Sequence, residues 1–235
     1  MANTVLLNNI DHKDVRIVTT RSAEYGDDVM FAVTFPAELR NIQAHYPIVF
    51  RKGSDGQFQP VALLGFEERQ NLFLTRDGWD ATYLPLMIER LPFLIGKANG
   101  QLVIHIDMDS PRVSRTTGER VFREHGGPTE FAERMNSVLL AIHEGLEQTP
   151  AFVAALLEHE LLESFVLDLQ LNDGSDHRLA GFYAINEERL AALDGAALER
   201  LNKAGHLLPA YMTLASLSQF RALIERRNRL HAEHR

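Results

Sequence analysis

The chain contains no cysteine among its 235 residues, which excludes disulfide bonds, thiolate metal sites and cysteine nucleophiles. It also lacks a long apolar run, since the longest, from Tyr83 to Ile95, is interrupted by Glu89, Arg90 and two prolines. A membrane-spanning helix needs about 20 consecutive apolar residues, so we expect no membrane span. The N-terminus has no basic segment, and its apolar run is only Val5-Leu6-Leu7. We therefore expect a cytoplasmic protein, unless a route without a cleaved signal exports it.

An excess of positive charge is also missing. Lysine and arginine number 24 against 32 acidic residues, which gives a net charge of −8. An electrostatic field that attracts phosphate backbones is not expected from such a chain, so nucleic acid is not an expected partner. The sequence has no P-loop, no GxGxxG after a strand, no GxSxG and no HExxH, which argues against the common NTPase, dinucleotide-binding and hydrolase classes.

What is present is the composition of an ordinary globular protein, 45% hydrophobic and 24% charged. Short β-rich segments separated by turn residues occupy the first half, and from Gly126 onward the apolar residues recur at helical spacing. We therefore predict an α+β fold in one domain, residues 1–235. Within it, residues 1–125 form a β-rich region with an antiparallel or mixed sheet, and residues 126–235 are mainly helical.

Several individual elements can be predicted. Tyr46–Arg51 and Pro60–Phe66 flank a turn and indicate a β-hairpin, and 101–108 is the clearest strand of the first half. Thr129 begins a helix, and Thr149-Pro150 has the residues of a second helix start, so we expect an αα-hairpin. A β-hairpin follows, because Phe165, Leu167, Leu169 and Leu171 alternate with Val166, Asp168 and Gln170 before the turn at 172–175. Helices complete the chain.

A series of short strings, spread in order over nearly the whole chain, resembles the bacterial SapC family. They include Phe35-Pro36-Ala37-Glu38, His45-Tyr46-Pro47-Ile48-Val49-Phe50, Tyr83-Leu84-Pro85, His105-Ile106-Asp107-Met108-Asp109-Ser110-Pro111-Arg112, His143-Glu144-Gly145-Leu146 and Ala215-Ser216-Leu217-Ser218. The family is named after a surface-layer locus, and relatives are often encoded beside outer-membrane TonB-dependent receptors. The resemblance implies a non-catalytic accessory or binding protein of a surface-layer or nutrient-uptake system, with a protein or peptide partner or a small ligand. It supplies no agreed catalytic residues.

Aromatic and charged residues of the first half form one candidate binding site. Rings together with a histidine and an arginine suit a cleft that stacks on a ring or peptide and pairs with a carboxylate. The candidate ligand-binding residues are His45, Tyr46, Trp79, Tyr83, Arg90 and Phe93. The alternative is that these aromatic residues, several of them next to prolines, fill the core and its turns.

A metal site is the enzymatic alternative. On a strand, His105, Asp107 and Asp109 share one face. A His-x-Asp pair supplies two of the three ligands of a non-haem iron site, and His177 could return to the same sheet as the third. This reading predicts an iron-dependent oxygenase-like enzyme. The plainer reading is a half-buried strand whose polar face meets water.

Overall fold

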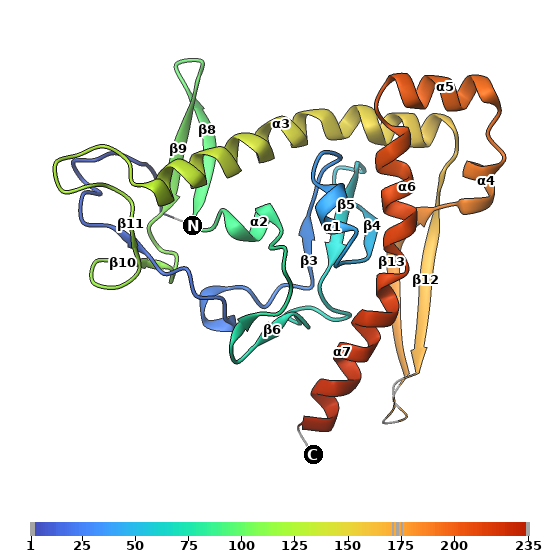
Figure 1. The fold of residues 1–235 in the computed structure, drawn as a ribbon, viewed down its shortest axis with the longest axis horizontal. Helices are drawn as coiled ribbons and strands as arrows, with labels where there is room; N and C mark the ends of the chain where they lie inside the picture. Colours follow the sequence, from blue (N-terminus) through green and yellow to red (C-terminus); the bar gives the residue numbers. More distant parts are fainter. Residues whose placement is uncertain (1–2, 171, 173, 175, 234–235) are drawn as a thin grey trace. The chain divides into compact units, whose positions relative to one another are not determined.

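The computed structural model of the chain describes residues 3–170, 172, 174 and 176–233 (Figure 1). The chain divides into two compact units, each assembled from three segments. Unit 1 comprises Met1–Asp27, Leu74–Trp79 and Leu86–Glu144, and unit 2 comprises Asp28–Phe73, Asp80–Pro85 and Gly145–Arg235. Both units draw on residues before and after Gly126.

Unit 1 consists of small antiparallel sheets. The first has the strand order β1 (Thr4–Leu6), β9 (Gln101–Asp107), β8 (Phe93–Ala98), and the second has the order β10 (Val113–Ser114), β2 (Arg16–Ile17), β11 (Glu119–Arg120). The strands β6 (Leu74–Thr75) and β7 (Gly78–Trp79) form a further pair, and the short helices are η1 (Ala23–Tyr25) and α2 (Leu86–Glu89). Asn99 and Gly100 join β8 to β9 with φ values of 52° and 78°, as a two-residue hairpin turn requires.

Unit 2 is built on a five-stranded antiparallel sheet. Its strand order is β12 (Leu162–Gln170), β13 (Asp176–Ile185), β4 (Ile48–Lys52), β5 (Phe58–Leu63), β3 (Phe31–Val33). Its helices are α1 (Leu39–Ile42), α4 (Glu187–Ala191), α5 (Gly195–Lys203), α6 (Leu207–Ser216) and α7 (Gln219–Glu233). Ile48, Val49 and Phe50 of β4 are completely buried, since β4 lies inside the sheet. The sheets and helices confirm the predicted α+β class, the β4–β5 hairpin and the C-terminal helices.

The predicted αα-hairpin is wrong. A single helix, α3 (Glu130–Glu158), runs through Pro150. Proline removes the hydrogen bond to the carbonyl four residues earlier, that of Leu146, at a cost of about 3 kcal/mol. Both Leu146 and Pro150 are exposed, so water can reach that carbonyl, while Thr149 Oγ1 donates to the Gly145 carbonyl over 2.9 Å. The buried residues Ile142, Phe152 and Leu156 hold the helix on both sides of the proline.

The predicted β-hairpin is present as β12 and β13, with one feature that the alternation did not indicate. Phe165 pairs with Phe182 but Leu167 pairs with Leu179, so β13 carries an extra residue. This β-bulge contains Gly181, whose φ of +85° suits glycine. Because of the extra residue, Phe182 and Leu179 lie on the same face although three positions separate them. Both are buried, with exposed fractions of 6% and 2%.

Candidate functional site

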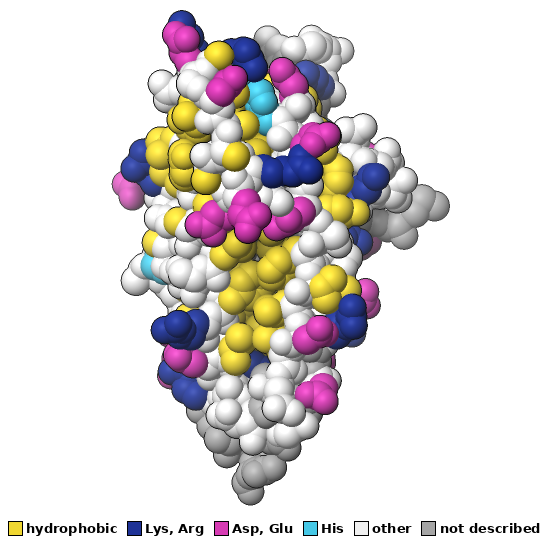
Figure 2. Space-filling model, turned by 90° about the vertical axis from the view of Figure 1, so that its right-hand side faces the viewer, with side chains coloured by type: hydrophobic (Ala, Val, Ile, Leu, Met, Phe, Trp, Pro, Cys, Tyr) yellow, Lys and Arg dark blue, Asp and Glu magenta, His cyan; other side chains and the backbone are white. Residues whose placement is uncertain are grey.

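The strand β12 forms an edge of the five-stranded sheet and pairs with β13 alone among the described strands. Its inner face is apolar: the ring of Phe165 stacks on Phe220 of α7 with 5.2 Å between centroids, and Leu167 is half-buried. Val166, between them, is 44% exposed. Figure 2 shows apolar side chains gathered in a strip on the side of unit 2 that carries β12, with Asp and Glu side chains across it. We call the strand β12, with its residues Phe165, Val166 and Leu167, the β12 edge.

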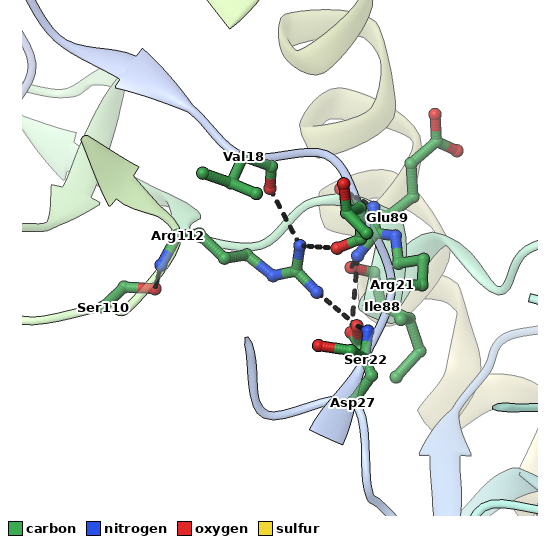
Figure 3. Close-up of polar contacts among 9 residues, drawn as sticks. Val18, Arg21, Ser22, Asp27, Ile88, Glu89, Ser110 and Arg112 are labelled. Carbon is green, nitrogen blue, oxygen red and sulfur yellow. Dashed lines mark hydrogen bonds and ion pairs between the residues drawn. The ribbon is translucent and has the colours of Figure 1, made fainter. Parts of the chain in front are cut away.

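Unit 1 contains a buried ion pair between Arg112 and Asp27, whose exposed fractions are 1% and 0% (Figure 3). Arg112 Nη2 donates to Asp27 Oδ2, and Nη1 donates to the carbonyls of Val18 and Thr20 over 2.9 and 3.0 Å. The guanidinium also lies 5.4 Å from the centroid of the Tyr25 ring. One arginine thus ties the turn after β9 to the segment 18–27.

A second arginine shares the same carboxylate. Arg21 Nη1 lies 3.5 Å from Asp27 Oδ1 and donates to the Ile88 carbonyl of α2 over 3.0 Å. Burial, and then the positive charge of Arg112, lower the pKa of Arg21, while Asp27 opposes this shift. The guanidinium groups of Arg21 and Arg112 donate to backbone carbonyls and to the carboxylate of Asp27. These hydrogen bonds hold the loops of unit 1 to one another. The sequence reading missed it, since 85 positions separate Arg112 from Asp27.

Three of the six predicted ligand-binding residues lie together in unit 2, around the carboxylate of Glu38, which is 2% exposed. Tyr83 Oη donates to Glu38 Oε1 over 3.0 Å, and Thr34 Oγ1 donates to Oε2 over 2.7 Å. Tyr46 Oη donates to the Tyr83 carbonyl. His45 Nε2 lies 3.1 Å from Thr82 Oγ1. The string that ends at Glu38 and the strings that contain Tyr46 and Tyr83 therefore meet in one buried polar cluster.

The other three predicted residues belong to unit 1. Arg90 Nη1 donates to the Phe93 carbonyl over 2.7 Å, and burial lowers the pKa of Arg90. Phe93 is 1% exposed, with its ring 6.2 Å from that of Phe131. Trp79 pairs with Leu74 between β7 and β6. A common cleft for the six residues stays a prediction.

The predicted metal ligands are placed in part. His105 and Asp107 alternate along β9 with Ile106, which is completely buried, so they share the outer face as expected. Asp107 Oδ1 accepts from the Asp109 amide over 3.1 Å, and the His105 ring lies so close to Gly96 that a Cβ there would be 2.7 Å from Cε1. The side chain of His177 lies outside the described residues. Among the described residues, no group of three or more His, Asp or Glu side chains could hold a metal ion.

A comparison of the chain with protein-family models gives a match over most of its length. A family model described as SapC matches residues 7–223. No curated protein and no solved structure matches the chain. None of the described helices is long and apolar enough to cross a membrane.

Proposed function

The chain belongs to the SapC family, and from this premise we propose that it is a non-catalytic accessory or binding protein of a bacterial surface-layer or nutrient-uptake system. Its ligand is a protein or peptide partner, which it binds at the β12 edge. The observation that carries this proposal is the exposed apolar side chain of Val166, 44% exposed, on a strand that pairs on one side only among the described strands. Apolar patches and open strand edges mark protein interaction sites when they occur on a protein surface.

The buried clusters support a structural role for the residues around them. In unit 2 the side chains of Glu38, Tyr46 and Tyr83 form hydrogen bonds with one another, with the Thr34 hydroxyl or with the backbone. In unit 1 the buried arginine Arg112 donates to Asp27 and to carbonyls. Buried hydrogen-bonded networks of this kind make a core more rigid, although Nε of Arg112 has no hydrogen-bond partner among the described residues.

Site-specific photo-crosslinking in the native cell tests the proposal. A photoreactive phenylalanine analogue replaces Val166 in one strain and Asn202, an exposed residue of α5, in a control strain. We expect an adduct with the same cell-envelope or uptake protein in repeated experiments at position 166 and none at position 202. Adducts that are equal at the two positions, or absent at both, would contradict a binding role for the β12 edge.

A second candidate function rests on the common outer face of His105 and Asp107. With a third ligand these side chains could hold iron(II) for an oxygenase-like reaction. The metal analysis described in the Discussion separates this candidate from the binding protein.

A further inference from the structure

We propose that the β12 edge binds an extended segment of its partner in which apolar residues alternate with lysine or arginine, and that this segment adds to the sheet of unit 2 as a further strand. The inference rests on the proposed function, because it names the chemistry of the partner for that same surface.

The backbone of β12 is suited to strand addition. In an antiparallel sheet, an edge strand directs half of its N–H and C=O groups away from its neighbour. β12 is nine residues long, contains neither proline nor lysine, and has its bulge on the partner strand β13, at Gly181. Proline, lysine and bulges are the usual means by which edge strands avoid pairing. β12 therefore offers a regular ladder over its whole length.

The side chains next to this ladder select apolar partners on one face. Phe165 and Leu167 share the helix side of the sheet, where Phe165 stacks on Phe220, and both are half-buried. In an added strand, every second side chain would lie beside them on the same face. Figure 2 shows an apolar strip on the side of unit 2 that carries β12.

The negative charge of the segment that contains β12 favours a partner segment with basic residues. Residues 158–189 contain eight acidic residues and two arginines, a net charge of −6 out of −8 for the whole chain. Asp168 stands exposed on the face of β12 opposite Phe165 and Leu167, where the basic side chains of an added strand would lie, and Glu163 stands exposed near the start of the strand. The pair between Asp168 and Arg178, 3.7 Å apart, is also exposed. A second copy of this chain would bring an equally acidic edge against the first, which like-charge repulsion disfavours. A strand with lysine or arginine at alternate positions complements both the ladder and the charge.

The test uses three fluorescent peptides of nine residues, the length of β12, with binding to the full chain followed by fluorescence anisotropy. The first alternates valine with lysine. The second has the same composition with its valines and lysines in separate blocks, and the third is the first with N-methyl groups on alternate amides. We expect the second and third to bind about tenfold more weakly, because they lose the alternation or the backbone hydrogen bonds of the added strand.

Substitutions in the protein test whether the peptides bind at the β12 edge. Val166→Lys should weaken binding of the alternating peptide by about tenfold, and Val166→Thr, which keeps the β-branched side chain, should retain it. Glu163→Gln with Asp168→Asn should weaken binding about twofold to fivefold. The matched control, Glu119→Gln with Glu124→Gln, removes two exposed charges of unit 1 and should leave the affinity unchanged.

Equal binding of the alternating and block peptides would show charge attraction alone and would overturn the inference, as would undiminished binding of the N-methylated peptide or no binding at all. Sedimentation of the wild type as a dimer that Val166→Lys dissociates would also overturn it, in favour of a second copy. If the peptides fail while the crosslink at position 166 persists, the inference falls and the proposed function stands. If the crosslink also fails, both fall.

Discussion

The carboxylate of Asp27 and the guanidinium of Arg112 form an ion pair in which the two residues are 0% and 1% exposed. Two charges removed from water to this extent are tolerated only while each satisfies the other. Arg112 additionally serves two carbonyls of the segment that leads to Asp27, so the pair joins parts of unit 1 that are distant in sequence.

Replacing Arg112 by methionine should lower the free energy of unfolding by about 3 kcal/mol, because the Asp27 carboxylate stays buried with weaker compensation. Urea denaturation measures the change. The control is Arg134→Met, which removes a solvent-accessible pair between the exposed Arg134 and the half-buried Glu89 (61% and 22% exposed) and should cost less than about 1 kcal/mol. Equal losses in the two variants would contradict a special role for the buried pair.

Gly145→Ala should destabilise the protein by about 1–3 kcal/mol, although alanine is the better helix former. A Cβ at position 145 would lie 2.0 Å from Cδ2 of Phe35, whose ring packs on the α3 backbone. The control is Gly195→Ala in α5, where nothing lies within 4 Å of the added atom and no loss is expected. Thermal unfolding compares them, and recovery of stability on adding Phe35→Leu would assign the cost to this contact. Tolerance of alanine at position 145 would contradict the close approach.

Pro150→Ala should stabilise the chain by up to about 3 kcal/mol, because it restores the N–H that bonds the Leu146 carbonyl and removes the clash of the proline ring. Calorimetric unfolding checks the sign. A lower melting temperature would mean that the proline contributes something beyond the helix, contrary to its exposed position.

Stability should fall as the pH falls through the unfolded pKa of histidine, partly because of His206. Burial, next to the Phe152 ring at 5.8 Å, lowers the pKa of His206 below 6.5. The unfolded chain therefore binds this proton more readily, and its contribution is complete above pH 6.5 and lost below it, down to the lower folded pKa. Urea midpoints at pH 7.5 and 5.5 should differ less in His206→Gln than in the wild type. His125→Gln, at an exposed site, controls for the loss of one histidine.

Elemental analysis of protein purified with and without oxygen decides between the binding protein and the iron enzyme. We expect no stoichiometric iron in either preparation and an unchanged fold in His105→Ala. Stoichiometric iron that disappears in His105→Ala would instead support the oxygenase-like alternative at His105 and Asp107.

Local patterns were sufficient to predict much of the fold. The turn residues at 52–57 indicated the β4–β5 hairpin, and the alternation at 165–171 indicated β12, since both signals depend on neighbours in sequence. The pair Thr149-Pro150 predicts a helix start but lies inside α3, because a threonine followed by a proline has the same sequence at either place. The two possibilities differ in which residues are buried, such as Phe152, and the local sequence does not show this.

The candidate sites were harder to predict because their partners are distant in sequence. Arg112 belongs to one of the segments that resemble the SapC family, but no residue near it in sequence predicts that its partner is Asp27. Likewise, Glu38 meets Tyr83 across 45 positions. The alternation of β12 predicted a strand, but whether a strand lies at the edge depends on the order of the whole sheet.

The order in which the ribosome delivers the strands of unit 2 has a consequence for biosynthesis. β4 is complete at Lys52, whereas β13, its partner on one side, begins at Asp176. At ordinary translation rates of about 5–20 residues per second, that interval lasts on the order of ten seconds. During it, the nascent chain presents Ile48, Val49 and Phe50 beside an open ladder. A holding chaperone thus has a defined window in which to act.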